Sequence, residues 1–242
     1  GCDIPSNGNV MANWKIRIAV GAWFSDESAA ETTYGHISTW DTSGVTDMAE
    51  LFCRWCDSAQ EAVSSFNEDI GAWDTSGVTT MTKMFWGAED FNRPIGDWSV
   101  GAVTDMQGMF DYAQSFDQPI GAWSVGNVKN LLGIFFQASA FNQDIGNWAV
   151  HSVRDMRGMF VLASAFNHDI GGWAVHNVTD MRGMFDRASA FDQDIGAWDT
   201  SGVTAMHYMF INALAFDRDI GEWAVHSVRE MTRMFNGASS FN

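Results

Sequence analysis

One phrase recurs along the chain at a fixed interval of 25 residues. It reads Phe-Asn-x-Asp-Ile-Gly-x-Trp and is followed by Val-x-x-Met-x-x-Met-Phe. The regularly spaced tryptophans are Trp73, Trp98, Trp123, Trp148, Trp173, Trp198 and Trp223. Trp40 fits the same phrase but lies 33 residues before Trp73. A unit of this length cannot bury its own apolar face, so successive units must stack. The period therefore predicts one elongated repeat body without an interdomain linker.

The apolar spacing changes within each unit. Ile95, Trp98, Val100 and Val103 follow the pattern Ile-x-x-Trp-x-(Val/Thr)-x-x-Val, in which the Trp and the Val or Thr are two residues apart. This alternation is typical of a strand with both side chains on one face. The Val-x-x-Met-x-x-Met-Phe that follows fits one face of a short helix or 3-10 turn. We therefore predict an α/β stack of right-handed coils with one parallel sheet and short helical arcs.

Residues 1–36 lie outside the period and are predicted to form a helical cap. Apolar residues from Trp14 to Trp23 favour a helix over about Val10 to Phe24, followed by a second short helix. Stacked repeats need such a cap to shield the first unit.

Residues 37–242 are predicted to form eight units. The isoleucines that open them are Ile37, Ile70, Ile95, Ile120, Ile145, Ile170, Ile195 and Ile220. An insertion at about 53–65 interrupts the period and carries Cys53 and Cys56. We expect a structural disulfide that joins Cys53 to either Cys56 or Cys2 and leaves one thiol over. A redox pair is an alternative, whereas a zinc site would need two further ligands that no second Cys-x-x-Cys or nearby His pair supplies.

Polar residues also recur in columns. The residue after the closing Phe is always Asn or Asp, from Asn67 to Asn242, and is predicted to form a structural ladder that satisfies turn N–H groups. A second acidic column consists of Asp69, Asp144, Asp169, Asp194 and Asp219. Pro94 and Pro119 interrupt it, which indicates an exposed turn. Calcium along this column is an alternative, although two rungs would be missing.

The methionine columns are predicted to be core. Leu131 and Ile134 occupy the same two positions in one unit, so these positions require apolar bulk rather than a soft-metal ligand. The Trp column is predicted to be core as well, with each indole N–H donating to a backbone carbonyl.

Residues beside the inward-facing Trp and Val or Thr should form an exposed, small and polar face. The candidate binding residues on this face are Asp74, Asp97, Asn147, His151, His176, Asp199, Glu222 and His226. Such a face offers few aromatic anchors, so we expect modest affinity for each chain and multivalent binding. A metal ion shared by His151 and His176 is an alternative, but solvated surface histidines are far commoner.

Charge and motifs exclude several function classes. The chain has 13 Lys and Arg against 30 Asp and Glu, a net charge of −17, which repels nucleic acids and anionic membranes. No apolar stretch approaches the roughly 18 to 20 residues of a spanning helix, so no membrane insertion is expected. No Gly-x-Ser-x-Gly, His-Glu-x-x-His or phosphate-binding Gly loop occurs, so we expect no catalysis. An active site would have to lie in the insertion or the cap.

The unit is built like a leucine-rich repeat, with Ile, Trp and Val or Thr in the three inward positions. The run from Phe191 to Met206 closely resembles the BspA-like surface-protein repeats, the DUF285 family, and the resemblance extends over Ile37 to Asn242. It implies a secreted or cell-surface array with a leucine-rich-repeat-like solenoid, linked to adhesion or protein interaction, and it brings no catalytic residues.

From this resemblance we expect a non-catalytic extracellular or cell-surface protein without a cofactor. Its partner would be a protein or glycan surface ligand. The alternative is a structural subunit of a larger extracellular assembly that self-associates end to end through further copies of itself.

Overall fold

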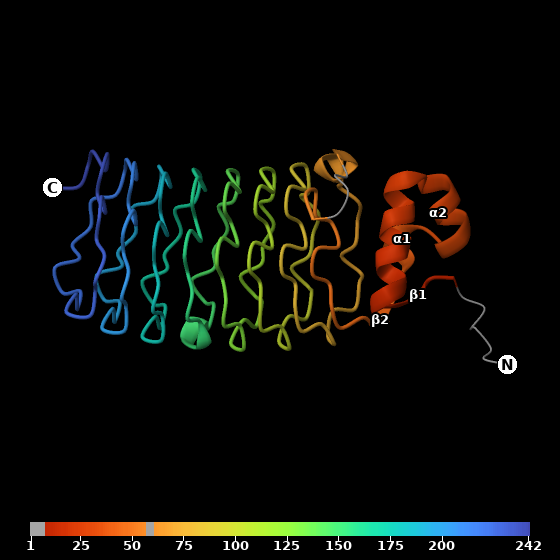
Figure 1. The fold of residues 1–242 in the computed structure, drawn as a ribbon, viewed down its shortest axis with the longest axis horizontal. Helices are drawn as coiled ribbons and strands as arrows, with labels where there is room; N and C mark the ends of the chain where they lie inside the picture. The colour runs from red at the N-terminus through yellow and green to blue at the C-terminus, as the bar shows by residue number, and fades with distance from the viewer. Residues whose placement is uncertain (1–7, 57–60) are drawn as a thin grey trace.

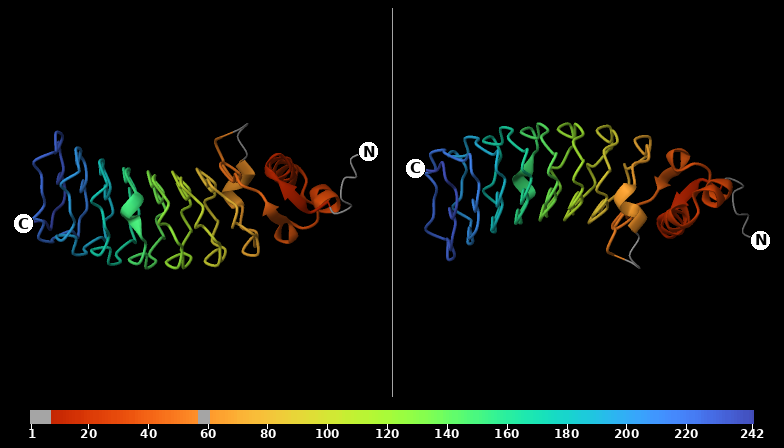
Figure 2. Two further views of the ribbon diagram at one scale, coloured as in Figure 1. Left: turned by 90° about the horizontal axis from the view of Figure 1, so that it is seen from below. Right: turned by 90° about the horizontal axis from the view of Figure 1, so that it is seen from above.

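The computed structural model of the chain describes residues 8–56 and 61–242. The repeat units stack one after another along the long axis of the molecule, and two helices cover the N-terminal end of the stack (Figure 1). Figure 2 shows the units as successive rungs from two further directions. None of the helices in the described ranges has the length and hydropathy that a bilayer-spanning helix needs. The repeat fold that the period predicts is therefore observed.

The N-terminal region contains most of the regular secondary structure. Strand β1 spans Val10–Ala12 and helix α1 spans Asn13–Ser25. The other elements are α2 (Glu27–Tyr34), β2 (Asp41–Gly44) and the 3-10 helices η1 (Ile37–Thr39), η2 (Glu61–Ser65) and η3 (Val150–Ser152). The helix expected over residues 10–24 is thus confirmed from Asn13 onward. Its first three residues instead form β1, which pairs in parallel with β2.

Helix α1 covers the first unit with one apolar face. Its buried residues are Ile16, Ala19, Val20 and Trp23, at spacings of three, one and three, which is one side of an α-helix. On the outward side Trp14 is 68% exposed and Ile18 is 54% exposed. The cap helix therefore continues the apolar core rather than standing apart from it.

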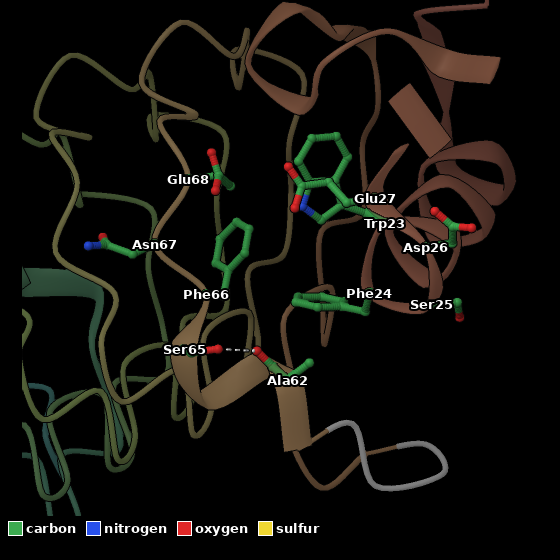
Figure 3. Close-up of a pocket in the computed structure, with 10 residues that line it drawn as sticks. All are labelled: Trp23, Phe24, Ser25, Asp26, Glu27, Ala62, Ser65, Phe66, Asn67 and Glu68. Atoms are coloured by element: carbon green, nitrogen blue, oxygen red, sulfur yellow. Dashed lines mark hydrogen bonds between the residues drawn. The ribbon is translucent and has the colours of Figure 1, made fainter. Parts of the chain in front are cut away.

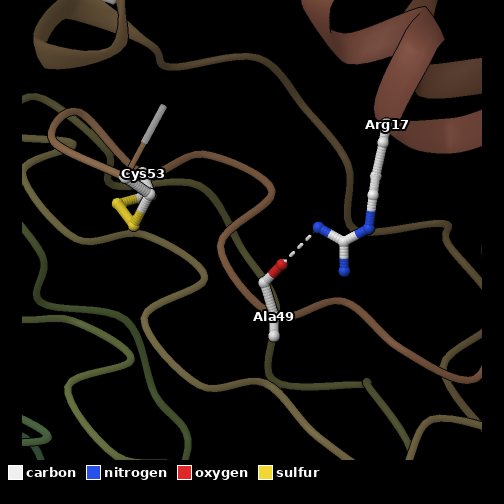
Figure 4. Close-up of a disulfide and its surroundings, with 4 residues drawn as sticks. Arg17, Ala49 and Cys53 are labelled. Atoms are coloured by element: carbon white, nitrogen blue, oxygen red, sulfur yellow. Dashed lines mark hydrogen bonds between the residues drawn. A yellow bond between two sulfur atoms is a disulfide. The ribbon is translucent and has the colours of Figure 1, made fainter. Parts of the chain in front are cut away.

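Polar groups of α1 replace the neighbour that the first unit lacks. In the next unit the carbonyl of Thr82 accepts a hydrogen bond from the backbone N–H of Glu50. The equivalent carbonyl of Ala49 instead accepts from Arg17 Nη1 at 2.7 Å (Figure 4). The side chain of Asn13 accepts from the backbone N–H of Thr46 at 2.8 Å. The cap thus satisfies backbone groups that stacking would otherwise leave unpaired.

Hydrogen bonds between units lie along the Val-x-x-Met-x-x-Met-Phe segment. The backbone N–H groups of Met81, Lys83, Phe85 and Gly87 each donate to a carbonyl of the next unit at 2.8 to 3.1 Å. Isolated parallel bridges run through Asp47, Thr80, Asp105, Asn130, Asp155, Asp180, Ala205 and Glu230. The prediction of a parallel sheet along the Trp segment was therefore wrong in position, since the ladder follows the segment that was expected to be helical.

Backbone geometry explains why the helical arcs are absent from this segment and its described copies. Lys83 has φ +53° and Gly87 has φ +80°, and the equivalent residues of the later units are also left-handed. A right-handed helix requires negative φ throughout. The chain makes consecutive tight turns instead, such as the bond from the N–H of Met84 to the carbonyl of Met81. These turns leave every second N–H directed along the stack.

The Trp segment packs by its side chains. The indole N–H of Trp123 donates to the carbonyl of Ile95 in the preceding unit at 3.1 Å, and the tryptophans from Trp73 to Trp223 repeat this bond. In the first unit Trp40 donates to the carbonyl of Gly35 instead. The predicted indole-to-carbonyl bond is confirmed. Thr75 is buried, and its hydroxyl donates to the carbonyl of Ser99 at 3.0 Å. Buried polar atoms on this segment are therefore paired with backbone groups.

Two phenylalanine columns fill the centre of each unit. Phe85 and Phe91 stack at 4.0 Å within one unit, and Phe85 stacks on Phe110 of the next unit at 5.6 Å. Leu131 and Ile134 are fully buried, as are the methionines that precede and follow them in their columns. The prediction that the two methionine columns belong to the core is therefore confirmed. Burial of each such side chain stabilises the fold by about 1.5–3 kcal/mol.

The Asn/Asp column forms the expected ladder. The side chain of Asn92 accepts from the backbone N–H of Asp117 at 3.0 Å, and Asp117 in turn accepts from Asn142 at 2.9 Å. The same bond joins each of the later units to the next. These carboxylates and amides therefore hold neighbouring turns together.

Candidate binding surfaces

All eight residues predicted for the binding face are exposed. Asp97, Asn147 and Glu222 directly precede a Trp, Asp74 and Asp199 directly follow one, and the three histidines come three residues after one. The repeat therefore arranges the eight residues in three rows beside the buried Trp column. The structure shows their exposure and leaves their binding role a prediction.

Local turns occupy two of these carboxylates. Asp74 accepts from the backbone N–H of Ser76 at 2.9 Å, and Asp199 accepts from the N–H of Ser201 at 3.1 Å and from its hydroxyl at 2.6 Å. Hydrogen bonds from the serine side chain and backbone lower the pKa of both carboxyl groups. Both groups are thus ionised near neutral pH and act first as turn acceptors.

The residues considered as metal ligands form no cluster. In residues 8–56 and 61–242 no three His, Cys, Asp or Glu side chains lie close enough together to hold a metal ion. The second acidic column caps turns instead, as when Asp144 accepts from the N–H of Gly146 at 2.9 Å. Asp69, Asp169, Asp194 and Asp219 make the same bond.

A shallow groove crosses the predicted face in the first units. It has a volume of about 730 Å³ and passes over Asp97. The residues that line it are Ser38, Asp69, Gly71, Ala72, Pro94, Gly96, Asp97, Pro119 and Ala122. A Cβ on Gly71 would lie 2.5 Å from the carbonyl oxygen of Pro94, so glycine is required for this close approach between units. The groove is therefore floored largely by small side chains and backbone.

A second cavity lies where the cap meets η2 (Figure 3). It has a volume of about 260 Å³ and combines the aromatic rings of Trp23, Phe24 and Phe66 with the carboxylates of Asp26 and Glu68. Asp26 also caps α2, since it accepts from the N–H of Ala29 at 3.0 Å. One of the acidic groups at this cavity therefore has a structural role.

The insertion begins with a disulfide. Cys53 is bonded to Cys56, with a Cα–Cα distance of 5.5 Å (Figure 4). The sequence allowed Cys53 to pair with Cys56 or with Cys2, and the structure contains the Cys53–Cys56 pair. Cys2 lies outside the described residues. The bridge encloses Arg54 and Trp55.

An aromatic cluster that the sequence interpretation missed lies beside this disulfide. Trp55 is 44% exposed and packs edge-to-face on Trp86 at 5.4 Å and on Tyr112 at 5.2 Å. Tyr112 stacks on Phe136 at 5.8 Å. Phe136 occupies an outer position of the repeat that varies from unit to unit. The equivalent residues are Trp86, Asp111, Val161, Asp186, Ile211 and Asn236. Variation at that position and at the next, between a constant Phe and a constant Ala, was the signal that could have identified the cluster.

Two positively charged groups lie over the aromatic rings. Lys83 Nζ lies 4.5 Å from the ring centroid of Trp86, and Arg54 Cζ lies 5.3 Å from that of Trp55. Arg54 also forms an ion pair with Glu89. Burial raises the pKa of Asp111 to about 7, and the positive charge of Lys83 opposes this rise. The cluster is thus an aromatic surface with a charged rim.

Comparison with known proteins gives a family. The family described as "Mycoplasma protein of unknown function, DUF285" matches three overlapping ranges, residues 21–143, 54–171 and 156–242. No curated protein matches the chain.

Proposed function

The chain belongs to the DUF285 family, and on that premise we propose that it is a non-catalytic binding module that acts outside the cell. The observation that supports this proposal is that the polar side chains fall into two sets, one that bonds within the stack and one that is exposed. The Asn/Asp ladder and the acidic turn caps are used to join and shape the units, while other positions remain exposed in register along the stack. Such a body is a rigid scaffold for recognition.

We also propose the finer architecture, a right-handed BspA-like solenoid of the leucine-rich-repeat type. Support comes from the three inward positions of each unit and from the parallel bridges that connect successive units. The left-handed turns of the Met segment distinguish this unit from a repeat with a true helix.

An extracellular location is supported by the Cys53–Cys56 bond. Disulfides persist mainly in oxidising compartments. Purification under thiol-blocking conditions followed by mass spectrometry tests this part of the proposal. We expect the Cys53–Cys56 peptide to be bridged in material taken from its native location, and a fully reduced pair would contradict it.

The partner would be a protein or glycan on another surface, bound in a multivalent manner. Array binding of the purified chain tests this, using immobilised extracellular proteins and glycans. We expect saturable binding, and the charge-reversing variant Asp97→Lys tests whether it uses the predicted face. Glu31→Lys, which reverses a charge at an exposed residue of α2 outside the repeats, is the matched control. No saturable binding on either array would overturn the proposal.

End-to-end assembly is a second candidate, favoured by apolar exposure in the last unit. Val225 is 47% exposed and Met231 is 40% exposed, whereas their equivalents Val100 and Met206 are buried. Another unit or a second copy would cover these side chains. Light scattering over a range of concentrations should then show growing mass that Met231→Lys abolishes, and a constant monomer mass would exclude this candidate.

A further inference from the structure

We propose that Trp55, Trp86 and Tyr112 form a platform that binds a neutral pyranose ring of a glycan. The inference rests on the proposed binding function and specifies its ligand class and its site. The site lies beside the disulfide, apart from the eight residues of the predicted face.

The rings are held in place before any ligand arrives. The Cys53–Cys56 bond closes a short loop around Trp55. Gly87, at φ +80°, lies beneath this side chain, since a Cβ there would stand 2.8 Å from the Trp55 ring. The backbone N–H of Arg54 donates to the carbonyl of Trp86 at 2.8 Å and aligns the two units. Binding to such a preorganised surface loses little side-chain entropy.

The size of the apolar area favours a sugar over a protein. A stable protein interface buries about 800 Å² on each partner and needs an apolar core. Here the exposed aromatic surface is limited to a few rings, with Arg54 over one side of the Trp55 ring, Lys83 over one side of the Trp86 ring, and Glu89 paired with Arg54. One face of a pyranose carries C–H groups over an area comparable to one aromatic ring. The platform therefore matches one or two sugar residues.

The rim has the chemistry that sugar hydroxyls require. A hydroxyl both donates and accepts hydrogen bonds. Arg54 and Lys83 supply donors, while Glu89 supplies an acceptor. Arg54 is paired with Glu89, and Lys83 faces the partly ionised carboxyl of Asp111, so the local charge is small, whereas the chain as a whole carries a charge of −17. This overall charge repels acidic sugars, so a neutral glycan fits best.

Titration of the full chain with neutral sugars tests the proposal. The probes are the methyl glycosides of glucose, galactose, mannose and N-acetylglucosamine, with the corresponding disaccharides, observed by saturation-transfer NMR and by tryptophan fluorescence. We expect at least one probe to bind the wild-type chain. Trp55→Ala should then weaken binding at least ten-fold, and Trp55→Phe should retain part of it. Trp14→Ala, at a more exposed tryptophan on α1, is the matched control and should leave affinity unchanged.

A second variant disturbs the platform without removing a ring. Gly87→Ala forces Trp55 to move, because the new Cβ would meet its ring, and should also weaken sugar binding. Gly183→Ala is its control, since Gly183 is also left-handed at φ +59° and the nearest atom lies 3.9 Å from the Cβ position there. Thermal melting of each variant shows whether the fold is retained.

The outcomes separate this inference from the proposed function. If no neutral sugar binds the wild-type chain, or if Trp55→Ala binds as well as the wild type, the platform assignment is wrong. Binding to a protein array in that case would leave the proposed function standing. Loss of protein binding in Trp55→Ala, without any sugar binding, would assign the cluster to a protein partner and overturn the glycan inference.

Discussion

Phe135 and Phe136 are adjacent, yet they belong to two different regions of the molecule. Phe135 is fully buried in a column that is Phe in each regular unit, whereas Phe136 is half-buried in the outer row that also contains Trp86 and Asp111. The inner columns repeat because each side chain must fill the same space between neighbours. The outer row is free to vary, and two members of the aromatic cluster, Trp86 and Phe136, lie in it. Positions that are constant among the units thus contribute to stability, whereas positions that vary can give different units different binding properties.

The largest expected effect comes from exchanging this pair for alanine one at a time. Phe135→Ala should destabilise the stack by about 3–5 kcal/mol, because it leaves a cavity among stacked rings. Phe136→Ala should cost about 1 kcal/mol or less, since its position tolerates Asp and Val. Urea unfolding followed by circular dichroism measures both. Equal losses of unfolding free energy in the two variants would contradict the distinction between inner and outer positions.

The Asn/Asp ladder provides a smaller effect. Asn92→Ala removes the acceptor for the backbone N–H of Asp117 and for the side chain of Gln118, and should cost about 1–2 kcal/mol. Asn92→Asp keeps an acceptor and reproduces what Asp117 does in the next unit, so its cost should stay below about 0.5 kcal/mol. The same urea titration applies. A costly Asn92→Asp would show that the ladder needs the amide itself.

A substitution at the contact between the cap and the first unit should destabilise the fold less than Asn92→Ala does. Arg17→Met removes the donor to the carbonyl of Ala49 and the ion pair with Asp47, and should cost about 1 kcal/mol because both groups are partly exposed. Arg154→Met, at an exposed arginine in the middle of the stack, is the control. Hydrogen exchange should show faster opening of the first unit in Arg17→Met alone. Unchanged protection there would remove the role assigned to Arg17.

A pH-dependent effect concerns Asp111 in the outer row. The folded-state pKa of Asp111 is about 7, above its ordinary value of 3.8, so the folded state favours the protonated form. Stability from this group is therefore present at acid pH and is lost as pH rises from about 4 through 7. The variant Asp111→Asn removes the carboxyl group and therefore this pH dependence. In the wild type, the positive charge of Lys83 opposes the rise in the pKa of Asp111. The melting temperature of Asp111→Asn should exceed that of the wild type by a margin that grows up to pH 7 and is constant above 8. A constant margin throughout would contradict the raised pKa.

Some features could be predicted from individual residues. Leu131 and Ile134 at methionine positions indicated core, and the Asn or Asp after each Phe indicated the ladder, because side-chain type reports burial and hydrogen bonding directly. The strand was misplaced because alternation of Trp98 and Val100 reports which side chains point inward, not which backbone groups bond to the next unit. Gly108 at its turn position was a partial sign of left-handed geometry, but Lys83 adopts the same geometry without glycine.

The sequence by itself determined the period, the inward columns and the family. Periodicity is a property of the order of side chains along the chain, so aligning the copies reveals it without knowledge of how they pack. Only the tertiary structure decided which segment forms the inter-unit ladder and which residues gather at the surface. Trp55 and Tyr112 are distant in the chain and meet because stacking places their units on either side of the unit that contains Gly87, where the glycine leaves room for the Trp55 ring. Contacts of this kind depend on how neighbouring units pack, which no single unit contains.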